Sequence, residues 1–207
     1  MNNMVSLILM AFMLTACRPE PDTSFYDDQE TFQFDAGANG MADPTPELPL
    51  TVDDWFGPSG YMGDGEDGLI EDTTCETRAP DAFGNCHRFV WTPGEKAWAG
   101  VYWQFPDGNW GTATGLNIPT GATAVQFTAW GETGNEVVTF GTGMGDVDGF
   151  SVELSNVELT TSPTEYRLEL TDVDYGRVVG GFVWTCTQAG EQVVFSIDNI
   201  QWVSASP

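Results

Sequence analysis

Positive charge is scarce in this chain. Its 207 residues include 31 Asp and Glu but only six Lys and Arg, and the formal net charge is −25. Electrostatic attraction to nucleic-acid phosphates or to anionic lipid headgroups needs many basic side chains. The balance therefore excludes nucleic acid as a partner. It fits either cation binding or the solubility of an acidic surface.

Histidine and cysteine are also rare. The chain has one histidine, His87, and four cysteines, and no two cysteines form a C-x-x-C pair. Structural zinc sites take four Cys or His ligands, and nucleophilic triads place a histidine between a nucleophile and a carboxylate. We therefore expect no zinc site and interpret His87 as a structural residue.

No long hydrophobic run is seen at the N-terminus. The apolar run from Val5 to Leu14 is too short to cross a bilayer and has the length of a signal-peptide core. The residues LTAC that end at Cys17 resemble the lipobox of bacterial lipoproteins. This resemblance implies a lipoprotein signal peptide over residues 1–16, a lipid on Cys17, and a location in the cell envelope, at the outer membrane or the cell surface. An ordinary secretory signal is the alternative, and either signal means export.

Residues 17–50 have the composition of a tether. From Arg18 to Leu50 the segment contains eight acidic residues, one arginine and several prolines, without a clear period. Such a segment cannot bury enough apolar area to offset its ordering entropy. We predict a disordered acidic linker, so that the protein meets the membrane only through its lipid.

The exported context also bears on the remaining cysteines. Cys75 and Cys86 are eleven positions apart in a segment rich in Gly, Pro and Asp, and such a pair is expected to form a disulfide outside the cytoplasm. Closing a loop of this size contributes about 2.8 kcal/mol in the chain-entropy model. Cys186 is left as a buried apolar residue.

Residues 51–207 consist of short runs of Val, Phe, Tyr, Trp and Thr between turn-forming residues, and no helical period is present. The expected strands are 52–56, 87–91, 98–105, 124–130, 136–141, 150–154, 157–160, 165–170, 178–185 and 192–202. This pattern predicts an all-β fold with a single core, an antiparallel sandwich or barrel.

Four segments of this region resemble the galactose-binding-like β-sandwich modules of secreted bacterial proteins. They are WAGVYWQFPDGNWG, GLNIPTGATAVQFTAWGETGNEVVTFG, DYGRVVGGFVWT and VVFSIDNIQW. The resemblance implies a jelly-roll β-sandwich and a non-catalytic carbohydrate-binding function, with a polysaccharide or another glycan as the partner. It also implies a structural Ca²⁺, because VDDWF and the closing IDNI match the positions that commonly share one. Asp54 and Asp198 are the expected ligands, with Asp53 as an alternative to Asp54.

The stretch from Gly100 to Gly111 carries four aromatic rings among turn formers. A sugar ring has an apolar face and hydroxyls at its edge, so it binds to a flat aromatic ring beside amides and carboxylates. Period-2 alternation places Trp103 in the core and Tyr102 on the opposite face. The residues expected to bind a ligand are Tyr102, Gln104, Asn109, Trp110 and Trp184, and for Trp184 a place in the core is the alternative.

Two other functions stay open. The same rings are consistent with a hydrophobic patch for adhesion to a protein partner. A glycoside hydrolase needs two carboxylates at a defined separation. Glu153, Ser155 and Glu158 follow the E-x-D-x-x-E spacing of retaining β-glucanases, but the central acid is missing. On one regular strand, Glu153 and Glu158 would also point to opposite faces. We therefore expect a non-catalytic module, and a hydrolase with a carboxylate pair that the sequence does not reveal is the second alternative.

Overall fold

The structure is a computed structural model that describes residues 46–188 and 190–205. The expected signal peptide, the site of lipidation at Cys17 and nearly all of the expected tether lie outside the described residues. Within the part that is described, no helix has both the length and the hydropathy to span a membrane.

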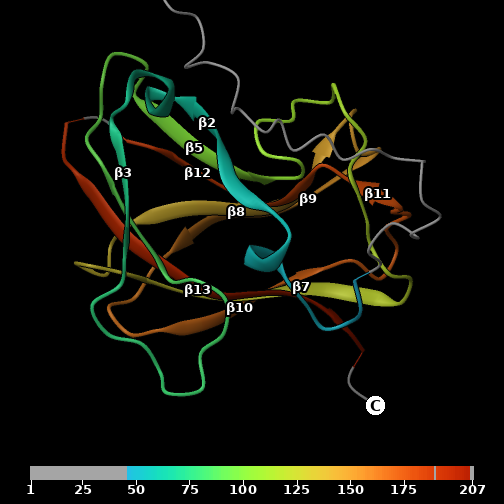
Figure 1. Cartoon of the computed structure of the whole chain (residues 1–207). Helices are drawn as coiled ribbons and strands as arrows, with labels where there is room; N and C mark the ends of the chain where they lie inside the picture. The colour runs from blue at the N-terminus through green and yellow to red at the C-terminus, as the bar shows by residue number, and fades with distance from the viewer. Residues whose placement is uncertain (1–45, 189, 206–207) are drawn as a thin grey trace, which may run out of the picture. The chain divides into compact units, whose positions relative to one another are not determined.

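Two antiparallel sheets face each other and form a β-sandwich, as the sequence predicts (Figure 1). We call them sheet A and sheet B. Sheet A has the order β10-β7-β13-β4-β3, and the short β1 pairs with β13. Its strands are β1 (Leu50–Thr51), β3 (Ile70–Thr74), β4 (His87–Trp91), β7 (Ala122–Gly131), β10 (Thr164–Glu169) and β13 (Val193–Ser204).

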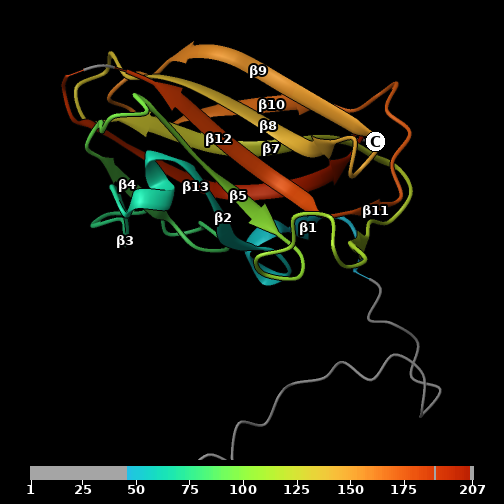
Figure 2. The ribbon, with the colours of Figure 1, turned by 90° about the horizontal axis from the view of Figure 1, so that it is seen from above.

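Sheet B has the order β2-β5-β12-β8-β9. Figure 2 shows the broad face of this sheet, with strands of sheet A behind it. Its strands are β2 (Gly57–Gly63), β5 (Trp98–Gln104), β8 (Val137–Gly145), β9 (Phe150–Glu158) and β12 (Gly180–Thr187). A small pair is formed by β6 (Leu116–Asn117) and β11 (Arg177–Val178), and two 3₁₀ turns are η1 (Val52–Asp54) and η2 (Asp64–Asp67).

The core lies between the two sheets. Alternate side chains of a strand point to opposite faces, and in β4 and β7 the burial follows this alternation most clearly. Among the largest fully buried side chains are Trp91, Phe89, Phe127, Phe195 and Trp202 from sheet A and Trp103, Phe140, Phe182 and Trp184 from sheet B. Leu50 of β1 belongs to this core. The folded domain thus begins before the expected boundary at residue 51.

One turn, one merged strand and two edge strands differ from the expected elements. The predicted strand 52–56 is the turn η1, because the amides of Trp55 and Phe56 both donate to the carbonyl of Val52. The strands expected at 150–154 and 157–160 form one strand, β9. Its register shifts by one residue near Asn156, which has a φ of 54°. The sequence analysis did not predict β2 or β3, each of which is one of the two edge strands of its sheet.

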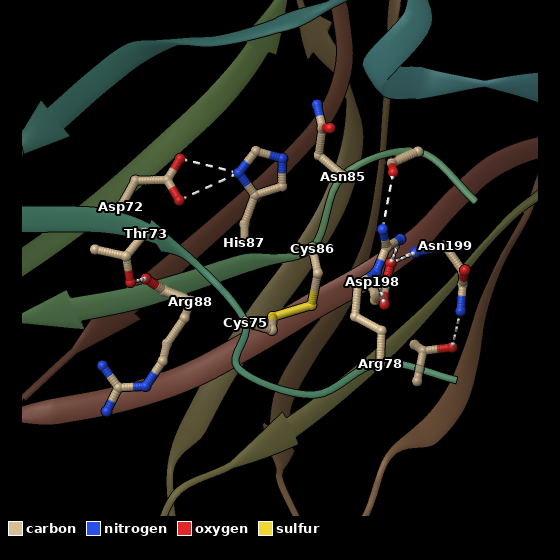
Figure 3. Close-up of a disulfide and its surroundings, with 12 residues drawn as sticks. Asp72, Thr73, Cys75, Arg78, Asn85, Cys86, His87, Arg88, Asp198 and Asn199 are labelled. Carbon is tan, nitrogen blue, oxygen red and sulfur yellow. Dashed lines mark hydrogen bonds and ion pairs between the residues drawn. A yellow bond between two sulfur atoms is a disulfide. The ribbon is translucent and has the colours of Figure 1, made fainter. Parts of the chain in front are cut away.

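The disulfide between Cys75 and Cys86 is confirmed. It closes the loop between β3 and β4, and this loop is also tied to β13 by Arg78 (Figure 3). Cys186 is free and buried, and its burial raises the pKa of the thiol to about 11. It therefore behaves as the apolar residue that the sequence suggests.

Candidate functional site

The candidate site is the outer face of sheet B. Trp98, Gly100, Tyr102 and Gln104 alternate with the buried residues of β5, so they point away from the core. The pairing register places one row of residues across all five strands of this face: Gly60, Tyr102, Val183, Gly141 and Glu153. Small side chains therefore dominate the middle of the sheet, and aromatic side chains stand along β5.

Trp98 lies flat on the sheet at one end of this face. A Cβ atom built on Gly63 would be 2.8 Å and 2.9 Å from Cδ2 and Cε2, the two ring-fusion atoms of the Trp98 indole. Because the Cβ would be almost equally far from the two atoms shared by the rings of the indole, one face of the indole covers Gly63. The side chain is nevertheless 39% exposed, so its other face is open. The nearby Lys96 donates to the carbonyl of Gly63 and to the carboxylate of Glu66.

Trp110 stands at the other end of the face and is 47% exposed. Its indole and the Tyr102 ring pack nearly perpendicular to each other, with 6.1 Å between the ring centroids. The Tyr102 ring is half-buried and packs against Gly180, where a Cβ would be 3.1 Å from Cε1 of the tyrosine. Burial raises the pKa of Tyr102, and the charges of Glu153 and Asp148 raise it further. Its phenol therefore stays protonated, and its hydroxyl donates to the carbonyl of Gly143 at 3.4 Å.

The name "aromatic face" is used below for this surface, defined by Trp98, Tyr102 and Trp110. The sequence analysis missed Trp98. The signal was present, because Trp98 is four positions before Tyr102 and shares its face in a period-2 strand.

Asn109 has a different position from the one expected. Its side chain is 2% exposed. Its Oδ1 accepts the amides of Gly111, Thr112 and Ala113, and its Nδ2 donates to the carbonyls of Phe105 and Ala113. The amide is saturated inside the loop, so Asn109 positions Trp110 and is not available for a ligand.

Gln104 and Trp184 are also enclosed. Gln104 is fully buried on the outer side of β5, where its Oε1 accepts from the hydroxyl of Ser59 at 3.2 Å. Within the described part of the chain, its Nε2 has no hydrogen-bond partner and no contact with solvent. Trp184 points inward with Phe182 and Cys186, and it packs edge-on against Phe195. The expected ligand role of Trp184 is therefore wrong, because the alternation of β12 directs it into the core.

Two of the expected calcium ligands, Asp198 and Asp53, are engaged by other groups, whereas Asp54 is exposed. Both carboxylate oxygens of Asp198 bind the guanidinium of Arg78, at 2.6 Å and 2.9 Å (Figure 3). Asp53 accepts from Trp103 Nε1 and lies 3.1 Å from His87 Nε2. In residues 46–188 and 190–205 no three metal-ligating side chains are grouped as a site. These carboxylates do not fit the calcium site, which needs six to eight free oxygens.

Glu153 and Glu158 do not form a hydrolytic pair. Contrary to the expectation for a regular strand, the register shift in β9 places both on the outer face, opposite Gly141 and Val137. Four residues of β8 separate these two partners, or about 13 Å along the strand. Retaining glycosidases need about 5 Å between carboxylates and inverting ones about 6.5–9.5 Å.

The comparisons with known proteins concern the fold. The chain matches no protein-family model, and no curated protein is similar to it in sequence. Two similar solved structures are the family 30 and family 11 carbohydrate-binding modules of cellulosomal cellulases from Clostridium thermocellum. Each is 15% identical with a TM-score of 0.47. The matches cover 79% of this chain and 96% and 97% of the modules.

A β-1,2-glucanase from Parabacteroides distasonis also matches, at 8% identity and a TM-score of 0.44, over 78% of this chain and 25% of the enzyme. The resemblance to β-sandwich carbohydrate-binding modules is thus found again in the solved structures. At this level of similarity it describes the arrangement of the two sheets, and no residue role is transferred from these proteins.

Proposed function

We propose that this domain is a non-catalytic glycan-binding module and that the aromatic face is its binding site. The observation that carries the proposal is the display of Trp98 and Trp110 on one side of β5, with Tyr102 between them. Large aromatic side chains usually hide most of their area. Here Gly63 and the loop ordered by Asn109 keep two indoles open to solvent.

The geometry favours an extended ligand. Trp98 and Tyr102 are four residues apart on β5, which corresponds to about 13 Å, and Trp110 lies beyond Tyr102. Small residues between these rings leave a shallow surface. A linear glycan lying along β5 would place sugar rings on the indoles and its hydroxyls near Tyr102 and Glu153.

The test is affinity for insoluble and soluble polysaccharides with the full-length protein. Trp98→Ala and Trp110→Ala should each weaken binding about tenfold, equivalent to ~1.4 kcal/mol, without a large change in Tm. Phe83→Ala is the matched control, since Phe83 is 36% exposed on the loop closed by the disulfide. Unchanged binding in both tryptophan variants would remove the aromatic face as the site.

We further propose that the module is held at the bacterial cell envelope by a lipid on Cys17. The proposal is supported by the sequence LTAC and by the acidic segment that separates Cys17 from β1. Labelling with a fatty acid should mark the native protein and fail to mark Cys17→Ser. Equal labelling of both proteins would contradict the anchor.

A further inference from the structure

The outer face of sheet A contains a hollow that the proposed function does not use. It has a volume of about 360 Å³. Its floor is one row of paired residues across four strands: Trp130, Ser196, Arg88 and Thr73. Glu132 and Glu76 also line it. The name "Trp130 hollow" is used below for this site.

Two polar groups of the floor, the indole N–H of Trp130 and the hydroxyl of Ser196, have unused hydrogen-bonding capacity. Trp130 is partly exposed, and no ring or hydrogen-bond partner of its indole is found among residues 46–188 and 190–205. Ser196 is 5% exposed and lines the hollow, and its hydroxyl has no hydrogen bond within the same residues. The Ser196 hydroxyl is not sealed from solvent, so it is open to the hollow and can bind a ligand or water there.

Arg88 is held loosely in comparison with the other arginine nearby. Among the described residues its guanidinium contacts only Glu132, at 3.4 Å, whereas Arg78 forms a bidentate pair with Asp198 at 2.6 Å and 2.9 Å. Figure 3 shows the Arg88 side chain pointing away from His87, its neighbour on β4, and so toward the outer face. Arg88 is one of only six basic residues in the chain, and its guanidinium lines the same hollow as the Trp130 indole, with Ser196 between them in the row.

The wall of the hollow is rigidly attached. Cys75, Glu76 and Thr77 belong to the loop that the disulfide to Cys86 closes. Arg78 then fixes this loop to β13 through Asp198. A site whose wall is already ordered loses less conformational entropy when a ligand binds.

The charges of the hollow define the class of ligand. Arg88 donates, while Glu76 and Glu132 accept, and the net charge of −25 repels anions. A neutral ring with an apolar face and hydroxyls at its edge matches the indole, the donors and the acceptors together. A volume of about 360 Å³ is near the small end of ligand pockets, which span roughly 300–1,000 Å³.

We propose that the Trp130 hollow is a second binding site, for a neutral sugar ring, on the sheet opposite the aromatic face. The inference rests on the proposed function only for the class of ligand. Because the outer faces of the two sheets point in opposite directions, one domain would hold two glycan chains at once. The domain would then cross-link polysaccharides as well as attach to them.

The experiment follows the eight indole N–H signals of ¹⁵N-labelled full-length protein by NMR. Conservative Trp→Phe variants assign Trp98, Trp110 and Trp130, and neutral gluco-, manno-, xylo- and galacto-oligosaccharides are titrated. The Trp130 signal should shift and saturate with at least one of them. Arg88→Ala should weaken this binding about tenfold. Arg167→Ala is the matched control, because Arg167 also lies on the outer face of sheet A but pairs with Glu169.

The outcomes separate the two sites. If Trp98 and Trp110 shift while Trp130 does not, the second site is overturned and the proposed function stands. If Trp130 alone shifts, the aromatic face is overturned and the second site stands. If no indole shifts with any of the sugars, both proposals fail. Agglutination of a soluble polysaccharide by the native protein, absent in Trp130→Phe with Arg88→Ala, would confirm that both faces bind together.

Discussion

The exposure of Trp98 depends on a single residue of the neighbouring strand. Gly63 has a φ of 59°, a conformation that side chains other than glycine rarely adopt. A Cβ at this position would also collide with the carbonyl oxygen of Trp98 and with its indole. Gly63 therefore allows this backbone conformation at the end of β2 and leaves room for the indole of Trp98 to lie flat.

Gly63→Ala should lower both stability and glycan affinity. The left-handed backbone costs about 1–2 kcal/mol, and the clash adds to it by moving Trp98. Gly68→Ala is the control, since Gly68 has a φ of 74° but no atom within 4 Å of a built Cβ. It should lose stability and keep its affinity. Denaturant titration and binding isotherms of the two variants make the comparison, and equal affinity in both would contradict the role of Gly63.

His87 lies between two carboxylates at the edge of the core. Its Nδ1 is 2.9 Å from Asp72 and its Nε2 is 3.1 Å from Asp53, and the ring is only 8% exposed. Burial by itself lowers the pKa of His87. The hydrogen bonds and charges of the two carboxylates outweigh it and raise the pKa from 6.5 to about 9. The ring is therefore a cation at neutral pH, which agrees with a structural role.

The raised pKa of His87 predicts a loss of stability at alkaline pH. The folded protein holds this proton more tightly than the unfolded chain, so the contribution is fully present below pH 6.5 and disappears as pH rises through about 9. It amounts to at most about 3 kcal/mol at ~1.4 kcal/mol per pKa unit. Urea unfolding at pH 6, 7.5 and 9 measures it. The dependence should flatten in His87→Gln, and an equally steep fall in that variant would assign it to other groups.

Among the elements, the loop after β5 is ordered by one side chain. Asn109 makes five hydrogen bonds with the backbone of this loop, each between 2.9 and 3.0 Å. The loop contains several turn formers and no other side chain with so many contacts to its backbone. The position of Trp110 is therefore a property of the whole loop.

Asn109→Ala should reduce glycan affinity about as much as Trp110→Ala, although the indole is still present. Buried backbone groups left without partners cost about 1–3 kcal/mol, so Tm should also fall by a few degrees. Limited proteolysis should cut the loop in this variant. Asn117→Ala, in the exposed position of β6, is the control. Full affinity in Asn109→Ala would show that Trp110 does not need the ordered loop.

The sequence predicted strands with clear alternation better than the edge strands β2 and β3. Alternation of buried and exposed residues identified β4 completely and β5, β7 and β13 within a few residues. The edge strand β2 reads as a turn because it contains Pro58 and three glycines, which an edge tolerates where a central strand does not. The edge strand β3 carries Glu71 and Asp72, and such charges are typical of edges that avoid further pairing.

The candidate site was predictable where it depends on one strand. Period-2 alternation placed Tyr102 outward and Trp103 inward, and the turn after β5 indicated an exposed Trp110. The prediction that Trp184 binds a ligand was wrong, because nothing in a hydrophobic strand such as β12 shows which face is covered by a second sheet. Gly63 contacts Trp98 across 35 positions of the sequence, and Arg78 contacts Asp198 across 120. A single sequence contains no signal for contacts between such distant segments.

At the scale of the whole molecule, the net charge of −25 complicates any test for calcium. Cations of every kind screen the repulsion among the carboxylates, so added salt should raise Tm without a specific site. The resemblance predicts a specific calcium, whose removal by EDTA would lower Tm by mass action. Asp198 is paired with Arg78, and Asp53 is paired with Trp103 and His87. These pairings predict that EDTA does not lower Tm.

We therefore expect EDTA to leave Tm unchanged, and Ca²⁺ and Mg²⁺ at equal ionic strength to raise it equally. Arg78→Ala provides the sharper comparison, because it leaves the nearly buried carboxylate of Asp198 without its cation. This variant should be less stable than the native protein and should gain more stability from Ca²⁺ than from Mg²⁺, since Ca²⁺ accepts irregular sets of oxygen ligands more readily. A native protein stabilised by Ca²⁺ alone, and destabilised by EDTA, would mean that the ion binds elsewhere, with the exposed Asp54 as the first ligand to substitute.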